Sequence, residues 1–325
     1  MRRRQLITIL GGAAASLLPR PLRAQRSAKV FRLGVLLYST PRGDPNNEAF
    51  QRGMSDLGYV DGQNIVFEYR FADGRPERLP ELASDLVRLN PDMIFALGGD
   101  VAPSARKATQ TIPIAFAVST DPVRSGLVAS LARPGGNATG VTFLLDDLAG
   151  KRLVLLKEAA PQISRVAVLF NPDHVDNELR EVERAAVALG VKLHLAEIRR
   201  SSDLEGALDA ALQAAVDALY VVSSRQTVAN IARITEFATR NRLPLAGGWG
   251  AWAQAGALIS YGPNVGEMVH QSTVYVDKIL KGANPAELPV QQPVRFELLI
   301  NFKTAKALGL AIPESFLLRA DKVIE

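Results

Sequence analysis

The sequence alternates short apolar runs, rich in β-branched residues, with longer segments in which apolar residues recur every three or four positions. Such alternation predicts right-handed βαβ units, with parallel strands forming one sheet that helices cover on both faces. In the first part of the chain we predict strands at 30–39, 64–72, 91–99, 112–118 and 138–144. The apolar period after the fourth of these strands predicts a helix over 122–132.

After a helix over 151–161 the same rhythm restarts. We predict further strands at 165–171, 191–198, 218–224, 243–247 and 256–262. Two successive α/β units predict two similar Rossmann-like lobes with parallel sheets. No Gly/Ser-rich or Pro-rich linker separates them, so the connection near 144–150 is expected to be a short hinge.

The first 24 residues have the anatomy of a bacterial export signal. Three arginines at 2–4 precede an apolar stretch at 6–18, and a cleavage site is expected near Ala24. The stretch is too short to span a bilayer comfortably. The consecutive arginines fit a twin-arginine signal, and an ordinary Sec signal remains the alternative. We therefore expect export to the periplasm.

The net charge of +5 depends on that segment, which holds five of the 38 basic residues and no acid. The remaining chain carries 33 basic against 33 acidic residues, which gives no reason to expect nucleic acid or a membrane surface as a partner. The chain has no cysteine, which excludes a lipid-modified cysteine anchor, thiol catalysis and zinc–cysteine sites. No cofactor is expected.

Several predicted strands end in small or hydrogen-bonding residues. Because ligands of open α/β sheets bind beyond the carboxyl ends of the strands, these residues are candidates for one cleft. They are Tyr38, Ser39, Thr40, Gly99, Asp100, Ser119, Asp121, Asn171, Ser223 and Tyr261. The competing interpretation is helix capping: Asp121 before Pro122 has the pattern of an N-cap, and Asp100 is placed to cap likewise.

Enzyme motifs are not found. The sequence has no G-x-S-x-G elbow, H-E-x-x-H pair or Walker loop. The three histidines are far apart: His194 is expected in mid-strand, and His174 and His270 on helix surfaces.

The whole chain from residue 30 onward resembles the ABC-transporter substrate-binding proteins of the type I periplasmic fold. The resemblance rests on "STDPVRSGLV", "RPGGNATGVT", "LFNPD" and above all on the C-terminal stretch that begins "LISYGPNVGEMVHQ" and ends "IPESFLLRADKVIE". It implies two lobes joined by a three-crossing hinge, with residues 30–145 and 262–290 in one lobe and 146–261 and 291–325 in the other. It also implies a ligand bound between the lobes.

Carried onto this sequence, the resemblance adds Thr142 and Trp249 to the strand-end candidates. Hydroxyl groups suit a carboxylate, while Tyr38, Trp249 and Tyr261 are placed to flank an apolar or aromatic body; for Trp249, lobe packing is the alternative. An amino acid would pair its ammonium group with Asp100 or Asp121, whereas a simple carboxylic acid has no cation for these carboxylates to bind.

The resemblance implies a monomeric receptor that delivers an amino acid or an aromatic or aliphatic carboxylate to an ABC permease. A receptor that reports its ligand to a sensor partner is the first alternative, and an exported α/β hydrolase is the second.

Overall fold

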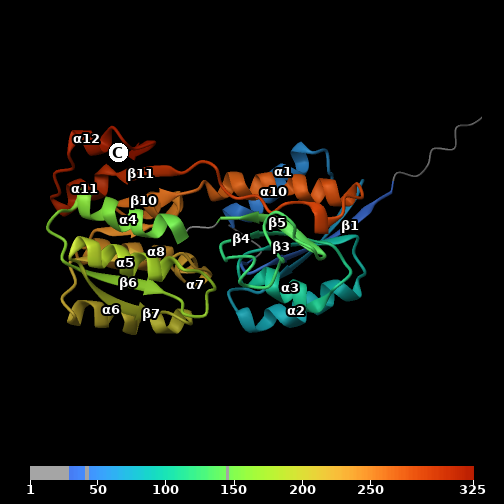
Figure 1. Cartoon of the computed structure of the whole chain (residues 1–325), viewed down its shortest axis with the longest axis horizontal. Helices are drawn as coiled ribbons and strands as arrows, with labels where there is room; N and C mark the ends of the chain where they lie inside the picture. Colours follow the sequence, from blue (N-terminus) through green and yellow to red (C-terminus); the bar gives the residue numbers. More distant parts are fainter. Residues whose placement is uncertain (1–28, 41–43, 144–145) are drawn as a thin grey trace, which may run out of the picture.

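The protein is described from a computed structural model, which covers residues 29–40, 44–143 and 146–325. Two α/β lobes lie side by side along the long axis of the molecule (Figure 1). The expected export signal lies outside the described residues.

The first lobe is built on a five-stranded parallel sheet in the order β2-β1-β3-β4-β5. Its strands are β1 (Phe31–Leu37), β2 (Ile65–Phe71), β3 (Met93–Leu97), β4 (Ile114–Val118) and β5 (Ala138–Thr142). Apolar residues of α1 (Pro45–Asp56) and α10 (Val265–Leu280) cover one face of the sheet. Those of α2 (Leu79–Arg88) and α3 (Val101–Ala108) cover the other.

The second lobe is built on a seven-stranded sheet in the order β12-β11-β10-β9-β8-β6-β7. Its strands are β6 (Arg165–Phe170), β7 (Lys192–Glu197), β8 (Ala218–Val221), β9 (Leu245–Gly247), β10 (Ile259–Gly262), β11 (Glu297–Asn301) and β12 (Lys322–Ile324).

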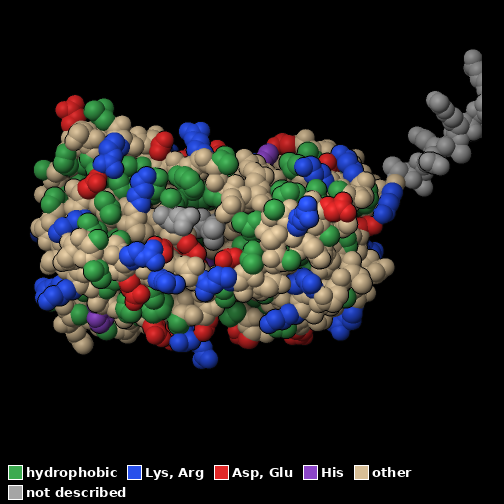
Figure 2. Space-filling view, viewed as in Figure 1, with side chains coloured by type: hydrophobic (Ala, Val, Ile, Leu, Met, Phe, Trp, Pro, Cys, Tyr) green, Lys and Arg blue, Asp and Glu red, His purple; other side chains and the backbone are tan. Residues whose placement is uncertain are grey.

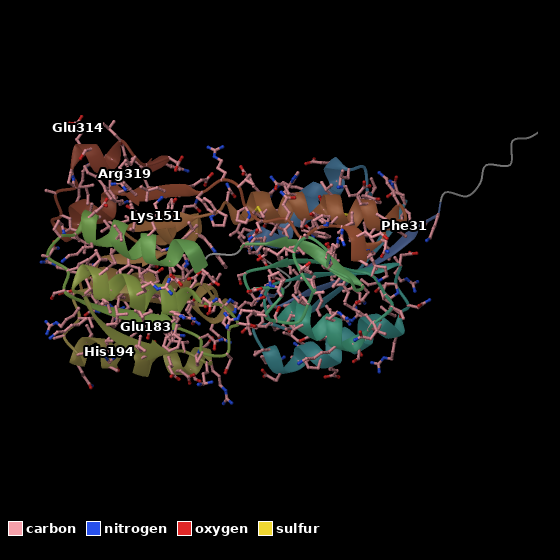
Figure 3. All side chains as sticks on the ribbon, viewed as in Figure 1. Phe31, Lys151, Glu183, His194, Glu314 and Arg319 are labelled. Atoms are coloured by element: carbon pink, nitrogen blue, oxygen red, sulfur yellow. The ribbon has the colours of Figure 1, made fainter. Side chains whose placement is uncertain are left out.

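Helices also cover both faces of the second sheet. On one face lie α4 (Asp146–Ala159), α5 (Glu178–Leu189), α11 (Phe302–Leu308) and α12 (Glu314–Leu317). On the other lie α6 (Leu204–Gln213), α8 (Ile231–Arg240) and α9 (Gly250–Ala255), while α7 (Arg225–Ala229) follows β8. His194 lies half-buried on β7, as expected for a strand residue (Figure 3).

The chain passes between the lobes three times: between β5 and α4, between β10 and α10, and before β11. The last passage runs along the first sheet, where the Gln291 amide donates to the Gly140 carbonyl at 3.0 Å. Two lobes joined by three crossings confirm the expected fold class.

One strand departs from the parallel pattern. β11 runs antiparallel to β10, although the other strand pairs described in this sheet are parallel. The chain leaves the second lobe at the carboxyl end of β10 and returns from the first lobe at that same edge, so the returning strand must run the opposite way. Sequence alternation does not encode this direction.

The helix expected over 122–132 is absent, and that prediction is wrong. The Asp121 carboxylate accepts hydrogen bonds from the backbone N–H groups of Val123 and Arg124, at 2.8 and 3.1 Å, and starts a single turn. Gly126 ends the turn at a φ of 72°. An Asp-Pro pair therefore caps an isolated turn here as readily as it would cap a helix.

Gly140 fixes the spacing of the last two strands in the first sheet, β4 and β5. It has a φ of 152°, and an added Cβ would overlap the carbonyl oxygen of Phe116 on the neighbouring β4. Only glycine allows β5 to approach β4 this closely. The last glycine of "RPGGNATGVT" thus has a structural role.

Candidate functional site

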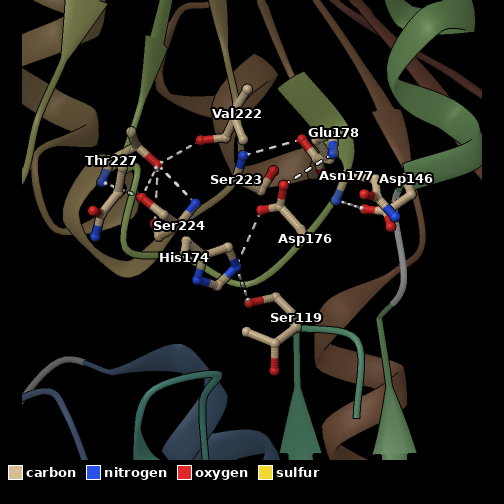
Figure 4. A network of polar contacts seen from close by, with 12 residues as sticks. Ser119, Asp146, His174, Asp176, Asn177, Glu178, Val222, Ser223, Ser224 and Thr227 are labelled. Atoms are coloured by element: carbon tan, nitrogen blue, oxygen red, sulfur yellow. Dashed lines mark hydrogen bonds and ion pairs between the residues drawn. The ribbon is translucent and has the colours of Figure 1, made fainter. Parts of the chain in front are cut away.

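The carboxyl ends of strands from both sheets face each other where the two lobes meet (Figures 1 and 4). Tyr38 follows β1 in the first lobe, and the Gln226 amide of the second lobe donates to its hydroxyl at 2.9 Å. The neighbouring Arg225 lies over the Tyr38 ring, 5.2 Å from its centroid. These contacts show that the lobes are closed on each other.

Arg225 reaches from α7 into the first lobe and donates to the backbone carbonyl of Leu97, at the end of β3. Gly98 makes room for it: its φ is 124°, and an added Cβ would overlap the guanidinium. A half-buried cation with one backbone acceptor thus joins the lobes.

The loop between β6 and α5 makes a second set of contacts between the lobes. The Asp121 amide donates to the Val175 carbonyl at 3.2 Å. The Arg124 side chain donates to the Asp176 carbonyl at 3.2 Å and to the Asn177 side chain at 2.5 Å.

His174 of this loop is buried between the lobes, so its expected place on a helix surface is wrong. Its Nε2 lies 3.4 Å from the Ser119 hydroxyl and 3.6 Å from the Asp176 carboxylate, and its Nδ1 lies 3.9 Å from the Asp100 carboxylate (Figure 4). Burial lowers the pKa of His174, but Asp100, Asp176 and Glu178 outweigh burial and raise that pKa above its ordinary value.

Burial shifts the pKa of two acids of the second lobe upward. It raises the pKa of Asp176 despite the nearby His174, and it raises the pKa of Asp146, which lies close to Asp121. In contrast, the pKa of Asp100 is lowered, because contact with His174 and the charge of Arg225 outweigh burial.

Beneath the loop lies a fully buried cation, Arg152 of α4. Its Nη1 donates to the Tyr220 hydroxyl at 2.6 Å and to the Glu178 carboxylate at 3.4 Å, and its Nε donates to the Tyr261 carbonyl at 3.1 Å. Burial raises the pKa of Glu178 to about 7, although Arg152 opposes this rise. Glu178 also accepts from the Ser223 amide at 3.2 Å.

Several buried polar atoms at the contact between the lobes have no hydrogen-bond partner within the described part of the chain. They are Ser39 Oγ and Thr120 Oγ1 from the first lobe, and Arg152 Nη2, Ser223 Oγ and Trp249 Nε1 from the second. Buried polar groups are almost always hydrogen-bonded in folded proteins. These atoms are therefore available to a bound polar molecule.

The other predicted site residues differ in their surroundings. Trp249 packs edge-on against Phe143 of the first lobe, with ring centroids 6.5 Å apart, and an added Cβ on Gly99 would lie 2.9 Å from His174 Cε1. Thr142 is buried and donates to the Thr120 carbonyl at 3.3 Å.

Three candidates lie away from this polar group or have local partners. Tyr261 packs on the core beneath α4, where Lys151 donates to its hydroxyl at 2.9 Å (Figure 3). The Asn171 side chain accepts from the Asp173 amide at 2.9 Å within its own loop, and Thr40 is exposed.

Sequence analysis missed Asp176, Arg225 and Gln226, which join the lobes, and the buried pair Arg152 and Glu178 behind them; it named His174 but placed it on a helix surface. A signal was present for Arg152, because it lies three residues after Ala149 and four before Leu156, within the apolar stripe of its helix.

The face shown in Figure 2 carries charges of both signs over both lobes. Across residues 29–40, 44–143 and 146–325, no helix has the length and apolar character needed to cross a membrane.

Residues 37–324 match the model of a family described as ABC transporter substrate binding protein. The tyrosine-binding protein of Clostridioides difficile (strain R20291) is 28% identical over 287 residues, covering 87% of this chain and 82% of that protein.

Two solved structures are informative about the arrangement of the lobes. The ABC domain in complex with L-Trp from Streptococcus pneumonia has a TM-score of 0.82 at 25% identity, covering 91% of this chain and 100% of that one. The ligand-free, open structure of a substrate-binding protein with adhesive properties from Clostridium difficile has a TM-score of 0.65 at 26% identity, covering 91% and 99%. The arrangement here is nearer to that of the L-Trp complex, in agreement with the contacts between the lobes.

Proposed function

This chain belongs to the ABC transporter substrate-binding proteins, and we propose that it captures a small carboxylate-bearing ligand, with an aromatic amino acid as the first candidate. The ligand would be held between the lobes and delivered to the membrane subunits of a permease. Substrate-binding proteins of this family bind small molecules and are not enzymes.

The observation that carries the proposal is the set of buried, unpartnered polar atoms contributed by both lobes at one contact. Ser39 and Thr120 in one lobe and Ser223 in the other offer hydroxyl groups, and Trp249 offers an indole N–H. A ligand that binds both sets at once stabilises the closed state relative to the open one, which is how capture between lobes works.

The buried charges support an amino acid over a simple acid. Asp100, Asp146, Asp176 and Glu178 surround the loop that carries His174, and an ammonium group is attracted to such a site. The relatives named for tyrosine and for a complex with L-Trp make aromatic amino acids the first compounds to test.

We further propose that residues 1–24 direct export and are removed near Ala24, leaving a monomeric receptor outside the cytoplasm. The two parts expected to move as units are 30–145 with 262–290, and 146–261 with 291–325.

A thermal-shift screen of the purified protein tests the function. The panel contains the amino acids and aromatic and aliphatic carboxylates, and each stabilising compound is re-isolated to show that it is unchanged. A ligand at 100 times its Kd adds about 2.7 kcal/mol to the free energy of unfolding, which is readily detected. If no compound in the panel raises the melting temperature, the proposed ligand class is wrong.

A further inference from the structure

Arg152 is a fully buried cation whose N–H donors are only partly paired. Its side chain is 0% exposed, and three of its hydrogen bonds are directed to Tyr220, Glu178 and the Tyr261 carbonyl. Its Nη2, which carries two N–H donors, has no partner among the residues that the structure describes.

Among the described residues, the Arg152 guanidinium is paired with one carboxyl group and keeps its Nη2 without a partner. Its one acidic partner, Glu178, lies 3.4 Å from Nη1, which is long for a charge-assisted hydrogen bond. Burial raises the pKa of Glu178, although the charge of Arg152 opposes this rise. The unpartnered Nη2 donors of a buried guanidinium are costly, and an anion beside them would supply the missing acceptors.

The free Nη2 lies beside Gly248 at the carboxyl end of β9. A Cβ added to Gly248 would lie 3.0 Å from Arg152 Nη2 and would overlap the Ser223 hydroxyl, which is also buried and unpartnered. The next residue, Trp249, contacts the first lobe through Phe143. The missing side chain of Gly248 therefore leaves two unpartnered donors beside the contact between the lobes.

We propose that Arg152 Nη2 and the Ser223 hydroxyl bind the carboxylate of the ligand beside Gly248. This assignment rests on the proposed capture of a carboxylate-bearing ligand. The two N–H donors of the guanidinium and the one hydroxyl match the acceptor oxygens of a carboxylate. The site should therefore bind a free carboxylate more tightly than an amide. Glu178 and Tyr220 are positioning residues that hold the guanidinium in place.

Calorimetric titration with three matched compounds tests whether the site recognises the ligand's carboxylate. The compounds are L-tryptophan, L-tryptophanamide and tryptamine. We expect L-tryptophan to bind about 10- to 100-fold more tightly than the other two, since a hydrogen bond to a charged group is worth about 1.5–3 kcal/mol. Equal binding of acid and amide overturns the assignment while capture itself stands. If neither L-tryptophan nor any other carboxylate in the screen binds, both proposals are overturned.

Serine variants separate a ligand contact from a structural role. Ser223→Ala removes an unpartnered hydroxyl, so the melting temperature of the free protein should stay the same or rise, while the affinity for L-tryptophan falls about fivefold or more. Ser260→Ala is the matched control. Ser260 is also fully buried with an unpartnered hydroxyl, but it pairs with Gly247 on the sheet face that carries Trp252, opposite to Arg152.

The ion pair itself is tested by replacing both charges together. Arg152→Met combined with Glu178→Gln avoids leaving one buried charge alone, and should abolish the preference for L-tryptophan over its amide. Gly248→Ala, whose Cβ would overlap the Ser223 hydroxyl and lie 3.0 Å from Arg152 Nη2, should do the same without removing any polar group. If Ser223→Ala and Gly248→Ala both retain the affinity and the preference of the original protein, the assignment is overturned.

Discussion

Replacing Gly98 by alanine is expected to weaken ligand capture by about 10- to 100-fold, because the new methyl group would occupy the space of the Arg225 guanidinium in the closed protein. Arg225 crosses from the second lobe to donate to the Leu97 carbonyl. Displacing it removes a hydrogen bond made by a charged group, worth about 1.5–3 kcal/mol, from the closed state alone.

The same substitution has a second effect that must be kept apart from the first. Gly98 has a φ of 124°, and alanine in such a conformation is strained by about 1–3 kcal/mol. This strain is present whether the lobes are open or closed. It therefore lowers the melting temperature of the free protein but does not change the affinity for ligand.

A double-mutant cycle distinguishes the two effects. Calorimetric titration with a ligand from the thermal-shift screen is carried out on the original protein, Gly98→Ala, Arg225→Ala and the double variant. We expect each single substitution to weaken binding and the double variant to bind about as well as Arg225→Ala, because the clash disappears with the guanidinium. If Gly98→Ala weakens binding by the same factor whether or not Arg225 is present, the proposed clash is refuted.

Three further results are expected. The acids around His174 raise its pKa above 6.5, so protonated His174 should stabilise the folded protein fully below pH 6.5, and this stabilisation should disappear as the pH rises through the raised pKa. The melting temperatures of the original protein and of His174→Gln, measured across pH, should therefore converge as the pH rises. A constant difference in melting temperature at all pH values would contradict the prediction. Gly140→Ala should lower the free energy of unfolding by about 3 kcal/mol or more in urea titration, since its Cβ would overlap the Phe116 carbonyl, and a loss under about 1 kcal/mol would exclude that clash. Trp249→Phe should keep most of the packing but lose the indole N–H, so affinity should fall about fivefold with little change in melting temperature; unchanged affinity would assign Trp249 to packing alone.

Local sequence is sufficient to predict the alternation of strands and helices because each predicted run matches one strand. The runs at 91–99 and 112–118 contain β3 and β4, whose residues are all buried. The strand ends also pointed to Ser39, Ser119 and Ser223, which lie at the contact between the lobes or carry unpartnered hydroxyls.

The features that sequence analysis did not predict depend on residues outside the local segment. Asp121 and Pro122 start a turn in the same way as they would start a helix, and the end of that turn is set by Gly126. Tyr261 stays a predicted site residue; because successive strand residues point to opposite faces, its side chain lies beneath α4, and a strand end alone does not show which face a residue takes. His174 looked like an exposed residue, since no local pattern shows that a second lobe covers it.

Different residues of this protein are expected to control its overall affinity and its preference among ligands. Arg225 and Gln226 stabilise closure through Leu97 and Tyr38. Any change in them alters the fraction of closed protein, and so should change the apparent affinity for every ligand by the same factor. The printed partners of Arg152 lie in its own lobe, and it is proposed to contact the ligand, so changes there should alter the order of preference among ligands. Affinity and selectivity can therefore change independently in this protein, because they depend on different residues of the same lobe.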